Sequence, residues 1–439
     1  MDKAPQKLTI STSWMPLGSG SRETAHTSVA IDVKAGDTSL TLNRNNWSHS
    51  VGSEAFVSAY PLAIWFASSW WRLRWEPGAD RQQSSDWLLS HLMSGANEGF
   101  LWPNLRFEST GEFIEIQSRA YKASTKEMVR FLSDENVLVA ANDFESAIDD
   151  FVARVIVRMD SFQLGRSELH ELWDELSKER NDAKLSKARR LEAIAGFDPG
   201  EMGDKALNSY LELEGTAGNV ATAEVAAACA GSNPAGFLQK AISQARKAVT
   251  PAKIPNIDLG QVPVSPGKPW LEGQVLAQLT RRKFHIPSGP ISDRQLAETL
   301  ELPRKELDPV TKTAERNVGL AIRDHGADDL RLSFRRSNRT SRRFETSRFL
   351  CEALQPGEKE QWFAQTDSRT ARQKRQRAFA IEFLCPFEEL RKEIPDYPTD
   401  TAIESAAKKY SVSPLAVASQ LVNHDVMSAE RLVEFASNG

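Results

Sequence analysis

One short run of the sequence, "HELWD" at His170–Asp174, carries residue types that could bind zinc. In the motif H-E-x-x-H, two histidines one helical turn apart bind the metal, and the glutamate between them activates a water molecule. Here Asp174 stands at the second histidine's position, and an aspartate can ligate zinc. However, the run lies inside the highly charged segment "SELHELWDELSKER", and the sequence offers no clear third ligand. The pattern therefore favours a structural helix over a metal site.

The other residues that commonly do chemistry are scattered. The six remaining histidines lie far apart, so none forms a pair at helical spacing. Cys229, Cys351 and Cys385 form no CxxC pair, which is typical of a protein in a reducing cytosol. A G-x-S-x-G elbow and a P-loop are both missing, and "GSGSRE" at Gly18 indicates only a loop. We therefore expect no metal and no cofactor.

Residues 1–140 form a tryptophan-rich block that holds eight of the eleven tryptophans. Two stretches alternate apolar and polar residues, "TAHTSVAIDV" and "TSLTLNRN", and "KAGD" between them predicts a hairpin. A second hairpin is predicted over "FESTGEFIEIQ", turning at Gly111, and helices over the run 55–71 and over "DWLLSHLM". The block therefore predicts an α+β domain in which a sheet packs on one or two helices.

The segment "WFASSWWRLRWEP" admits two interpretations. Aromatic residues interleaved with arginines suit a platform for stacking bases of a single strand. Alternatively, Ile64, Trp71 and Trp75 share one face of a core helix. The side chains of Arg72 and Arg74 then either extend their charged ends to solvent or stack on the indole rings. The sequence favours the core helix. The apolar run 55–71 is too short to span a bilayer, and the N-terminus lacks an apolar signal region, so we expect a cytoplasmic protein without membrane contact.

The rest of the chain divides by pattern into three further segments. Residues 141–249 show helical periodicity and i,i+4 charge pairs, so they predict a helical domain. Residues 250–269 carry five prolines and predict a linker or an extended strap. Residues 270–439 are mostly helical, with two strands predicted around "DHGADD". The expected fold class is α+β and mostly helical.

The C-terminal third contains the most specific patterns. "RQRAFAIEFLCPFEELR" is followed by "IESAAKKYSVSPLAVASQLVN", and "DDLRLSFRRSNRTSRRFETSRFLCEAL" precedes both. In this order the three segments resemble the ImmA/IrrE metallopeptidase family over about residues 310–430. The resemblance implies a zincin-like helical module with a small sheet. It also implies a bacterial stress-response, toxin–antitoxin or antiphage-defence setting, because active members cut repressors.

Carried over by position, the resemblance implies a module without peptidase chemistry. The first zinc histidine falls on Arg348, the general-base glutamate on Phe349, the second histidine on Glu352 and the third ligand on Gln373. A guanidinium has no acceptor for a metal, and a phenyl ring cannot take a proton from water. These are vestigial positions, and we expect no catalytic residue among them.

The same region is strongly basic, although the whole chain has a net charge of −4. Between Arg331 and Arg377 there are thirteen Lys and Arg residues against five Asp and Glu residues. They form either an anion-binding or nucleic-acid-binding site or a basic face paired internally with Glu345, Glu352 and Glu382. The candidate site residues are Arg335, Arg336, Arg342, Arg343, Arg348, Arg372, Arg375 and Arg377.

Three functions follow from these patterns. The first is a non-catalytic regulatory, sensor or scaffold protein that acts through a protein partner. The second is a nucleic-acid-binding component that uses the arginine cluster of 331–377. The third is an active metallohydrolase with an unrecognised site, such as "HELWD". The sequence favours the first.

Overall fold

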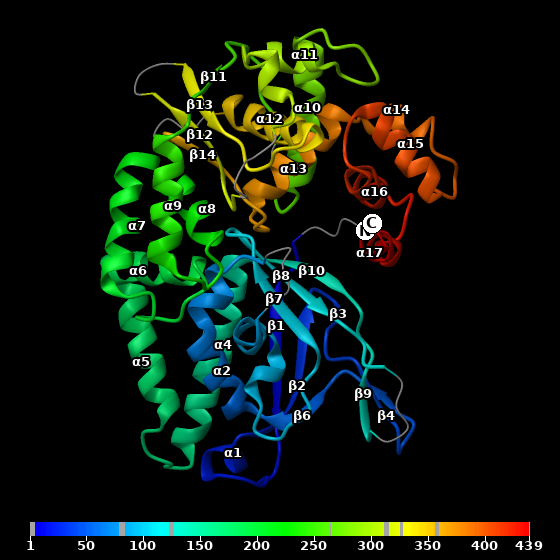
Figure 1. Cartoon of the computed structure of the whole chain (residues 1–439). Coiled ribbons are helices and arrows are strands. Elements are labelled where there is room, and N and C mark those ends of the chain that lie inside the picture. Colours follow the sequence, from blue (N-terminus) through cyan, green and yellow to red (C-terminus); the bar gives the residue numbers. More distant parts are fainter. Residues whose placement is uncertain are drawn as a thin grey trace. The chain divides into compact units, whose positions relative to one another are not determined.

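The structure, a computed structural model, describes residues 5–78, 84–122, 127–263, 265–310, 316–324, 328–355 and 360–438. The chain forms two compact units (Figure 1). Unit 1 comprises Met1–Leu207 and Cys229–Pro234, and unit 2 comprises Asn208–Ala228 and Ala235–Gly439. About 50% of the chain is helical and 16% is strand, so the α+β class holds and helices supply most of the packing surfaces.

Unit 1 contains three small antiparallel sheets among its described residues. In the first, β2 (Ser28–Ala35) pairs with β1 (Leu8–Trp14), β3 (Thr38–Ser39) and β6 (Ala55–Ser58). The second has the order β10 (Asn136–Ala140), β8 (Phe113–Ser118), β7 (Leu105–Ser109). The third has the order β5 (Val51–Gly52), β4 (Asn43–Asn45), β9 (Val129–Phe131).

Both predicted hairpins of unit 1 are present, but the first has shorter arms than predicted, because residues 24–26 are helical and residues 43–45 join another sheet. The β2–β3 turn contains Gly36 at φ 56°, and the β7–β8 turn contains Gly111 at φ 100°. Glycine adopts positive φ values with less strain than residues that carry a Cβ, so these turns are encoded locally. The β1 strand, which pairs with β2 along its whole length, was not anticipated from the sequence.

The helix α2 (Ala59–Trp75) is the centre of the core of unit 1. Trp65, Trp70 and Trp71 are 3–5% exposed, so the core interpretation of this segment is confirmed and these rings are no stacking platform. The predicted start of the helix at Ala55 is wrong. Residues 55–58 are strand β6, and the side chain of Ser58 caps α2 by accepting a hydrogen bond from the Tyr60 amide.

The remaining helices of unit 1 surround this core. α4 (Ala141–Ser161) packs against β1, β8, β10 and α2, and buries Phe144, Ile148, Phe151 and Val155 on one face. α1 (Arg22–His26), α3 (Ser85–His91), η1 (Met93–Ala96), α5 (Glu168–Asn181) and α6 (Ala183–Ile194) complete it. α7 (Asp204–Ala217) crosses into unit 2, which also holds α8 (Asn219–Ala227) and most of α9 (Pro234–Arg246). The helical segment predicted over 141–249 is thus shared between the units.

Unit 2 contains one antiparallel sheet in its described part, with the order β11-β13-β12-β14. The predicted strap begins as β11 (Thr250–Lys253), which pairs with β13 (Asp329–Ser333). The two predicted strands are β12 (Gly319–Arg323) and β13, although residues 325–327 of their turn lie outside the described residues. The edge strand β14 (Trp362–Gln365) pairs with β12.

Helices pack on this sheet and on one another. α10 (Pro269–Lys283) lies close to α13 (Ala371–Leu384), because Gly273 lets the backbones approach; a Cβ there would collide with the Arg375 carbonyl. The other elements are α11 (Asp293–Glu298), η2 (Arg304–Leu307), α12 (Arg339–Ala353), α14 (Phe387–Arg391), α15 (Asp400–Tyr410), α16 (Pro414–Asn423) and α17 (Ala429–Asn438). No helix in the described ranges is long and apolar enough to cross a membrane.

Candidate functional site

The four positions that the resemblance assigns to a zinc site lie on α12 and α13, and both helices begin at well-formed caps. The Asn338 side chain accepts a hydrogen bond from the Ser341 amide at 2.8 Å, and Thr370 accepts one from the Gln373 amide at 3.2 Å. α12 and α13 pack against each other, and α12 also packs against β14. This arrangement places Arg348 opposite Gln373 and Glu352 opposite Gln376 (Figure 1 shows the two helices side by side).

Arg348 is buried at the centre of this arrangement, with 3% exposure. Its Nη2 donates to Gln373 Oε1, to Gln376 Oε1 at 3.0 Å and to the Thr366 carbonyl at 3.1 Å. These acceptors are all neutral. Burial lowers the Arg348 pKa to about 9, and the positive charges of Arg377 and Arg335 act in the same direction. The guanidinium is therefore held by amide dipoles.

Glu352, one helical turn further along α12, has the opposite surroundings. Its Oε2 accepts from Arg372 Nε at 2.6 Å, and its Oε1 lies 3.5 Å from Arg375 Nη2. Burial opposes ionisation of this carboxyl, but the two guanidinium groups outweigh it and hold the Glu352 pKa below its ordinary value. Gln376 links the two charges, because its Oε1 accepts from Arg348 while its Nε2 donates to Glu352 Oε1 at 3.0 Å.

The other two of these positions are Gln373 and Phe349. Gln373 Oε1 also accepts from the Thr366 amide at 2.9 Å, and its Nε2 donates to the Ala364 carbonyl at 2.9 Å, so this amide is fully engaged. Phe349 is 0% exposed and packs edge-on against Phe334, with ring centroids 6.0 Å apart. The structure thus brings Arg348, Glu352 and Gln373 into one network and places Phe349 in the apolar core.

These residues do not fit a zinc ion. Arg348 has no lone pair to offer, the Gln373 oxygen already accepts two hydrogen bonds, and Glu352 is paired with two arginines. Over the described residues, no group of three or more His, Cys, Asp or Glu side chains could hold a metal ion. No metal-dependent step is therefore assigned to these residues.

The other candidate arginines are mostly engaged inside unit 2. Arg335 bonds Asp367, Arg343 bonds Asp293, Arg342 donates to the Glu306 carbonyl, and Arg377 donates to the Ser368 carbonyl. Of the eight, Arg336 is exposed, whereas Arg335, Arg342, Arg343 and Arg348 are buried. Anion binding by this cluster stays a prediction, since most of its arginines bond other groups of unit 2.

Sequence reasoning missed a buried carboxyl beside this network, Glu224 of α8. Its Oε1 accepts a hydrogen bond from Thr370 Oγ1 at 2.7 Å, and burial raises its pKa despite Thr370 and Arg372 nearby. Glu360 likewise accepts from the Val220 and Ala221 amides and caps the same helix. A signal was present: Glu224 is the single charge in the apolar run "VATAEVAAACA". A lone carboxyl in such a run indicates a buried polar contact.

The "HELWD" residues have structural roles in unit 1. His170 Nδ1 takes part in the capping box of α5 with Ser167, and its Nε2 lies 3.3 Å from Asp160 Oδ1. Asp174 pairs with Arg166 at 2.6 Å. These contacts give His170 and Asp174 structural roles.

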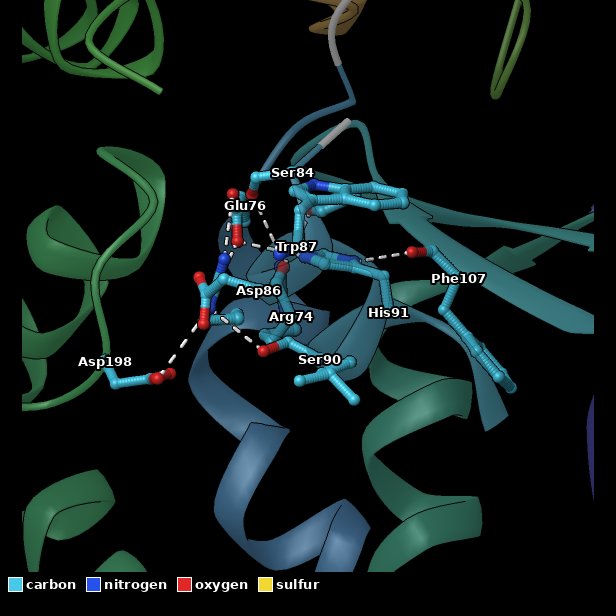
Figure 2. A network of polar contacts seen from close by, with 12 residues as sticks. Arg74, Glu76, Ser84, Asp86, Trp87, Ser90, His91, Phe107 and Asp198 are labelled. Atoms are coloured by element: carbon cyan, nitrogen blue, oxygen red, sulfur yellow. Dashed lines mark hydrogen bonds and ion pairs between the residues drawn. The ribbon is translucent and has the colours of Figure 1, made fainter. Parts of the chain in front are cut away.

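A second buried polar network, not anticipated from the sequence, lies in unit 1 (Figure 2). Arg72 Nε donates to Glu76 Oε2 at 2.6 Å, and Arg72 Nη1 donates to Asp86 at 2.7 Å and to Ser90 at 2.9 Å. Asp198 lies 3.7 Å from the same guanidinium. Burial raises the pKa of Asp198, and Arg72 opposes this shift. Part of this network could be predicted from the sequence, because Arg72 and Glu76 lie four residues apart near the end of a helix.

His91 is the fully buried end of this second network, at 0% exposure. Figure 2 shows its ring under Trp87, with which it stacks at 4.1 Å, and pointing to the Phe107 carbonyl. Nδ1 lies 2.7 Å from that carbonyl oxygen, and Nε2 lies 2.9 Å from Glu76 Oε2. A carbonyl can only accept, and so can an ionised carboxylate. Burial opposes ionisation of Glu76, but His91 and Arg72 outweigh it and hold the Glu76 pKa below its ordinary value.

Comparison with protein-family models, with curated proteins and with solved structures finds no match for this chain.

Proposed function

We propose that this chain is a non-catalytic regulatory, sensor or scaffold protein built on a pseudo-metallopeptidase module. It would act through a protein partner in the cytoplasm, in a bacterial stress, toxin–antitoxin or antiphage-defence system. The setting follows from the resemblance to the ImmA/IrrE family alone. Support for a lack of catalysis comes from the side chains at positions 348, 349, 352 and 373 of unit 2.

One observation carries the proposal. The resemblance assigns two histidines, a general base and a third ligand to positions 348, 352, 349 and 373. Three of these positions meet in one buried network, which is what a shared architecture would require. The groups there are a guanidinium, a paired carboxylate and an amide, and the would-be base is a buried phenyl ring. The network therefore supports an inherited scaffold whose metal chemistry has been replaced by internal hydrogen bonds.

The two alternative functions have less support. A nucleic-acid site at 331–377 needs free guanidinium groups, but Arg335, Arg343 and Arg372 are paired with carboxylates. A zinc site at "HELWD" needs its polar side chains as ligands, but His170 caps α5 and Asp174 pairs with Arg166. Neither alternative accounts for the buried network.

The test begins with the unaltered protein. Purified full-length protein should contain no stoichiometric zinc, and added zinc should leave its thermal unfolding midpoint unchanged. Stoichiometric zinc that disappears in His170→Ala would contradict the proposal and support a metallohydrolase.

A restored ligand set tests the resemblance itself. The variant Arg348→His, Phe349→Glu, Glu352→His and Gln373→Glu recreates the family's residues at all four positions. If the positions correspond, zinc should bind with 1:1 stoichiometry and raise the unfolding midpoint, because a ligand that binds only the folded state stabilises it. Adding Arg372→Gln removes a guanidinium that would otherwise lose its partner Glu352. If both variants fold and neither binds zinc, the assignment of positions is wrong.

A further inference from the structure

The third sheet of unit 1 forms a small ribbon, defined here as residues 42–52 and 127–131. β4 pairs with β5 on one side and with β9 on the other, and Figure 1 shows β4 and β9 side by side at the margin of unit 1. In this register Arg44 lies directly opposite both Val51 and Arg130. Directly opposite residues point to the same face of a sheet, so Val51, Arg44 and Arg130 form one row across the ribbon.

Trp47, in the β4–β5 turn, is 83% exposed. Five other tryptophans of unit 1, Trp65, Trp70, Trp71, Trp87 and Trp102, are 3–7% exposed. Val51 and Met128 of the ribbon are also exposed, each at 61%. Leaving a large indole in water forgoes the favourable free energy of burying it. The exposure of Trp47 is therefore unusual among the tryptophans of this unit, and with Val51 and Met128 it makes the ribbon a candidate contact surface.

The turn that presents Trp47 is held by several hydrogen bonds. Asn45 Oδ1 accepts from the amides of Trp47 at 2.9 Å and Ser48 at 3.1 Å. The Asn46 amide donates to the Met128 carbonyl at 2.8 Å, which ties the turn to the neighbouring segment. Hydrogen bonds thus hold the backbone of the turn on both sides, so the exposed Trp47 ring extends from an ordered turn.

The charges of the ribbon indicate what it contacts. Arg44 and Arg130 are like charges in directly opposite positions, which destabilises a sheet unless an anion compensates them. Arg44 Nη2 lies 3.4 Å from His49 Nδ1, and Arg130 Nε donates to the Tyr121 carbonyl. Among the ion pairs of the described ranges, neither guanidinium has a carboxylate partner. The ribbon thus offers two basic groups on one face and an exposed aromatic ring in the adjoining turn to an anionic partner.

We propose that the ribbon binds single-stranded nucleic acid, with a base stacked on Trp47 and the flanking phosphates on Arg44 and Arg130. Exposed aromatic rings beside arginines are the usual means of holding a single strand, because every base has a face that can stack. A second copy of this chain is disfavoured as the occupant, since two such faces would set arginines against arginines. The proposal concerns unit 1 alone, and its test does not depend on the function proposed for unit 2.

The experiment measures binding of fluorescein-labelled oligothymidine, twenty nucleotides long, to the full-length protein by fluorescence anisotropy at low salt. Trp47→Ala should weaken binding by about fivefold to 100-fold, the usual effect of removing one stacking ring. Trp47→Phe should recover part of this loss. Arg44→Ala with Arg130→Ala should weaken binding and reduce the slope of log K against log salt by about 1.4, because about 0.7 is lost per phosphate contact.

Matched controls come from the same unit. Phe56→Ala removes another exposed aromatic ring, 65% exposed, and Arg119→Ala removes an arginine that is paired with Asp134. Both should bind the oligonucleotide like the unaltered protein, and all variants should keep its unfolding midpoint. The proposal is overturned if the unaltered protein does not bind, or if Trp47→Ala binds equally well. It is also overturned if poly-glutamate or anionic phosphatidylserine vesicles bind as tightly with the same dependence on Trp47, because the ribbon would then recognise an acidic polypeptide or a lipid surface.

Discussion

Two buried arginines, Arg72 in unit 1 and Arg348 in unit 2, are accommodated in different ways. Arg72 is bonded to two carboxylates, Glu76 and Asp86, with a third, Asp198, at 3.7 Å. Burial alone would lower its pKa, but Glu76 and the other acids outweigh burial and raise it. Arg348 donates hydrogen bonds to the neutral oxygens of Gln373, Gln376 and Thr366, and burial lowers its pKa to about 9.

The charge of its partners, rather than burial alone, therefore decides how strongly a buried guanidinium is held in place. Arg72 is one member of an ion-pair network, so removing its main partner leaves an uncompensated charge. Arg348 depends on amides that are themselves held by the backbone of β14 and of the segment that follows it. The two sites should therefore respond differently to substitution.

The largest effect is expected for Glu76→Ala. The substitution leaves Arg72 and His91 buried without their shared carboxylate, and breaking a buried pair from one side costs about 3–5 kcal/mol. Chemical denaturation at pH 7 measures the loss. Because the Glu76 pKa is lower in the folded state than the ordinary value of 4.5, its contribution is present above that value and is lost as the pH falls below it. The difference between variant and unaltered protein should accordingly shrink in acid.

A smaller effect, about 1–3 kcal/mol, is expected for Arg348→Met. The change removes a buried charge that has no bonded carboxylate, but leaves Gln376 Oε1 without its donor. Urea denaturation of this variant beside Glu76→Ala compares the two sites directly. An equal or larger loss for Arg348→Met would show that amide dipoles hold a guanidinium as firmly as carboxylates do.

Glu224→Gln should stabilise the protein by about 1 kcal/mol at pH 8. The folded-state pKa of Glu224 is raised by burial, so its favourable contribution is complete below the unfolded pKa and is lost as the pH rises through the folded pKa. Glutamine keeps an oxygen to accept from Thr370 and never ionises. The unfolding midpoints of variant and unaltered protein should converge near pH 4. A variant that is less stable at pH 8 would mean that the ionised carboxylate is required beside Arg372.

The smallest effect is expected for Asp86→Ala, at most about 1 kcal/mol. Asp86 bonds the same Arg72, but its side chain is 67% exposed. Solvent and salt screen such a partner, so raising the salt concentration should reproduce most of the loss in the unaltered protein. A loss comparable to that of Glu76→Ala would remove the distinction between buried and exposed partners of Arg72.

Local patterns predicted the parts of the fold that depend on neighbouring residues. The glycines at positions 36 and 111 predicted the two hairpin turns. Apolar periodicity identified α2 as a core helix, but could not separate it from strand β6, because "AFVS" is apolar enough for either structure.

The candidate sites depend on contacts between distant residues, which local patterns do not carry. Glu224 and Thr370 are 146 residues apart, and β11 joins β13 across the intervening helices. Arg348, Glu352 and Gln373 could be placed near one another only because a family resemblance supplied the arrangement. No pattern in "TLNRNNWSHSVG" distinguished Trp47 from the tryptophans of the core.

The capping of α8 by Glu360 has a consequence for synthesis of the chain. The Ala221 amide and the Glu360 carboxylate that bonds it are 139 residues apart, and Thr370 lies further on. At about 5–20 residues per second, a ribosome needs roughly 7–30 seconds to produce the partner of a helix that has already emerged. During that interval α8 is an alanine-rich segment with a bare N-terminus. A fragment that begins at residue 235 would lack α8 altogether, so a soluble version of unit 2 should keep residues 208–228.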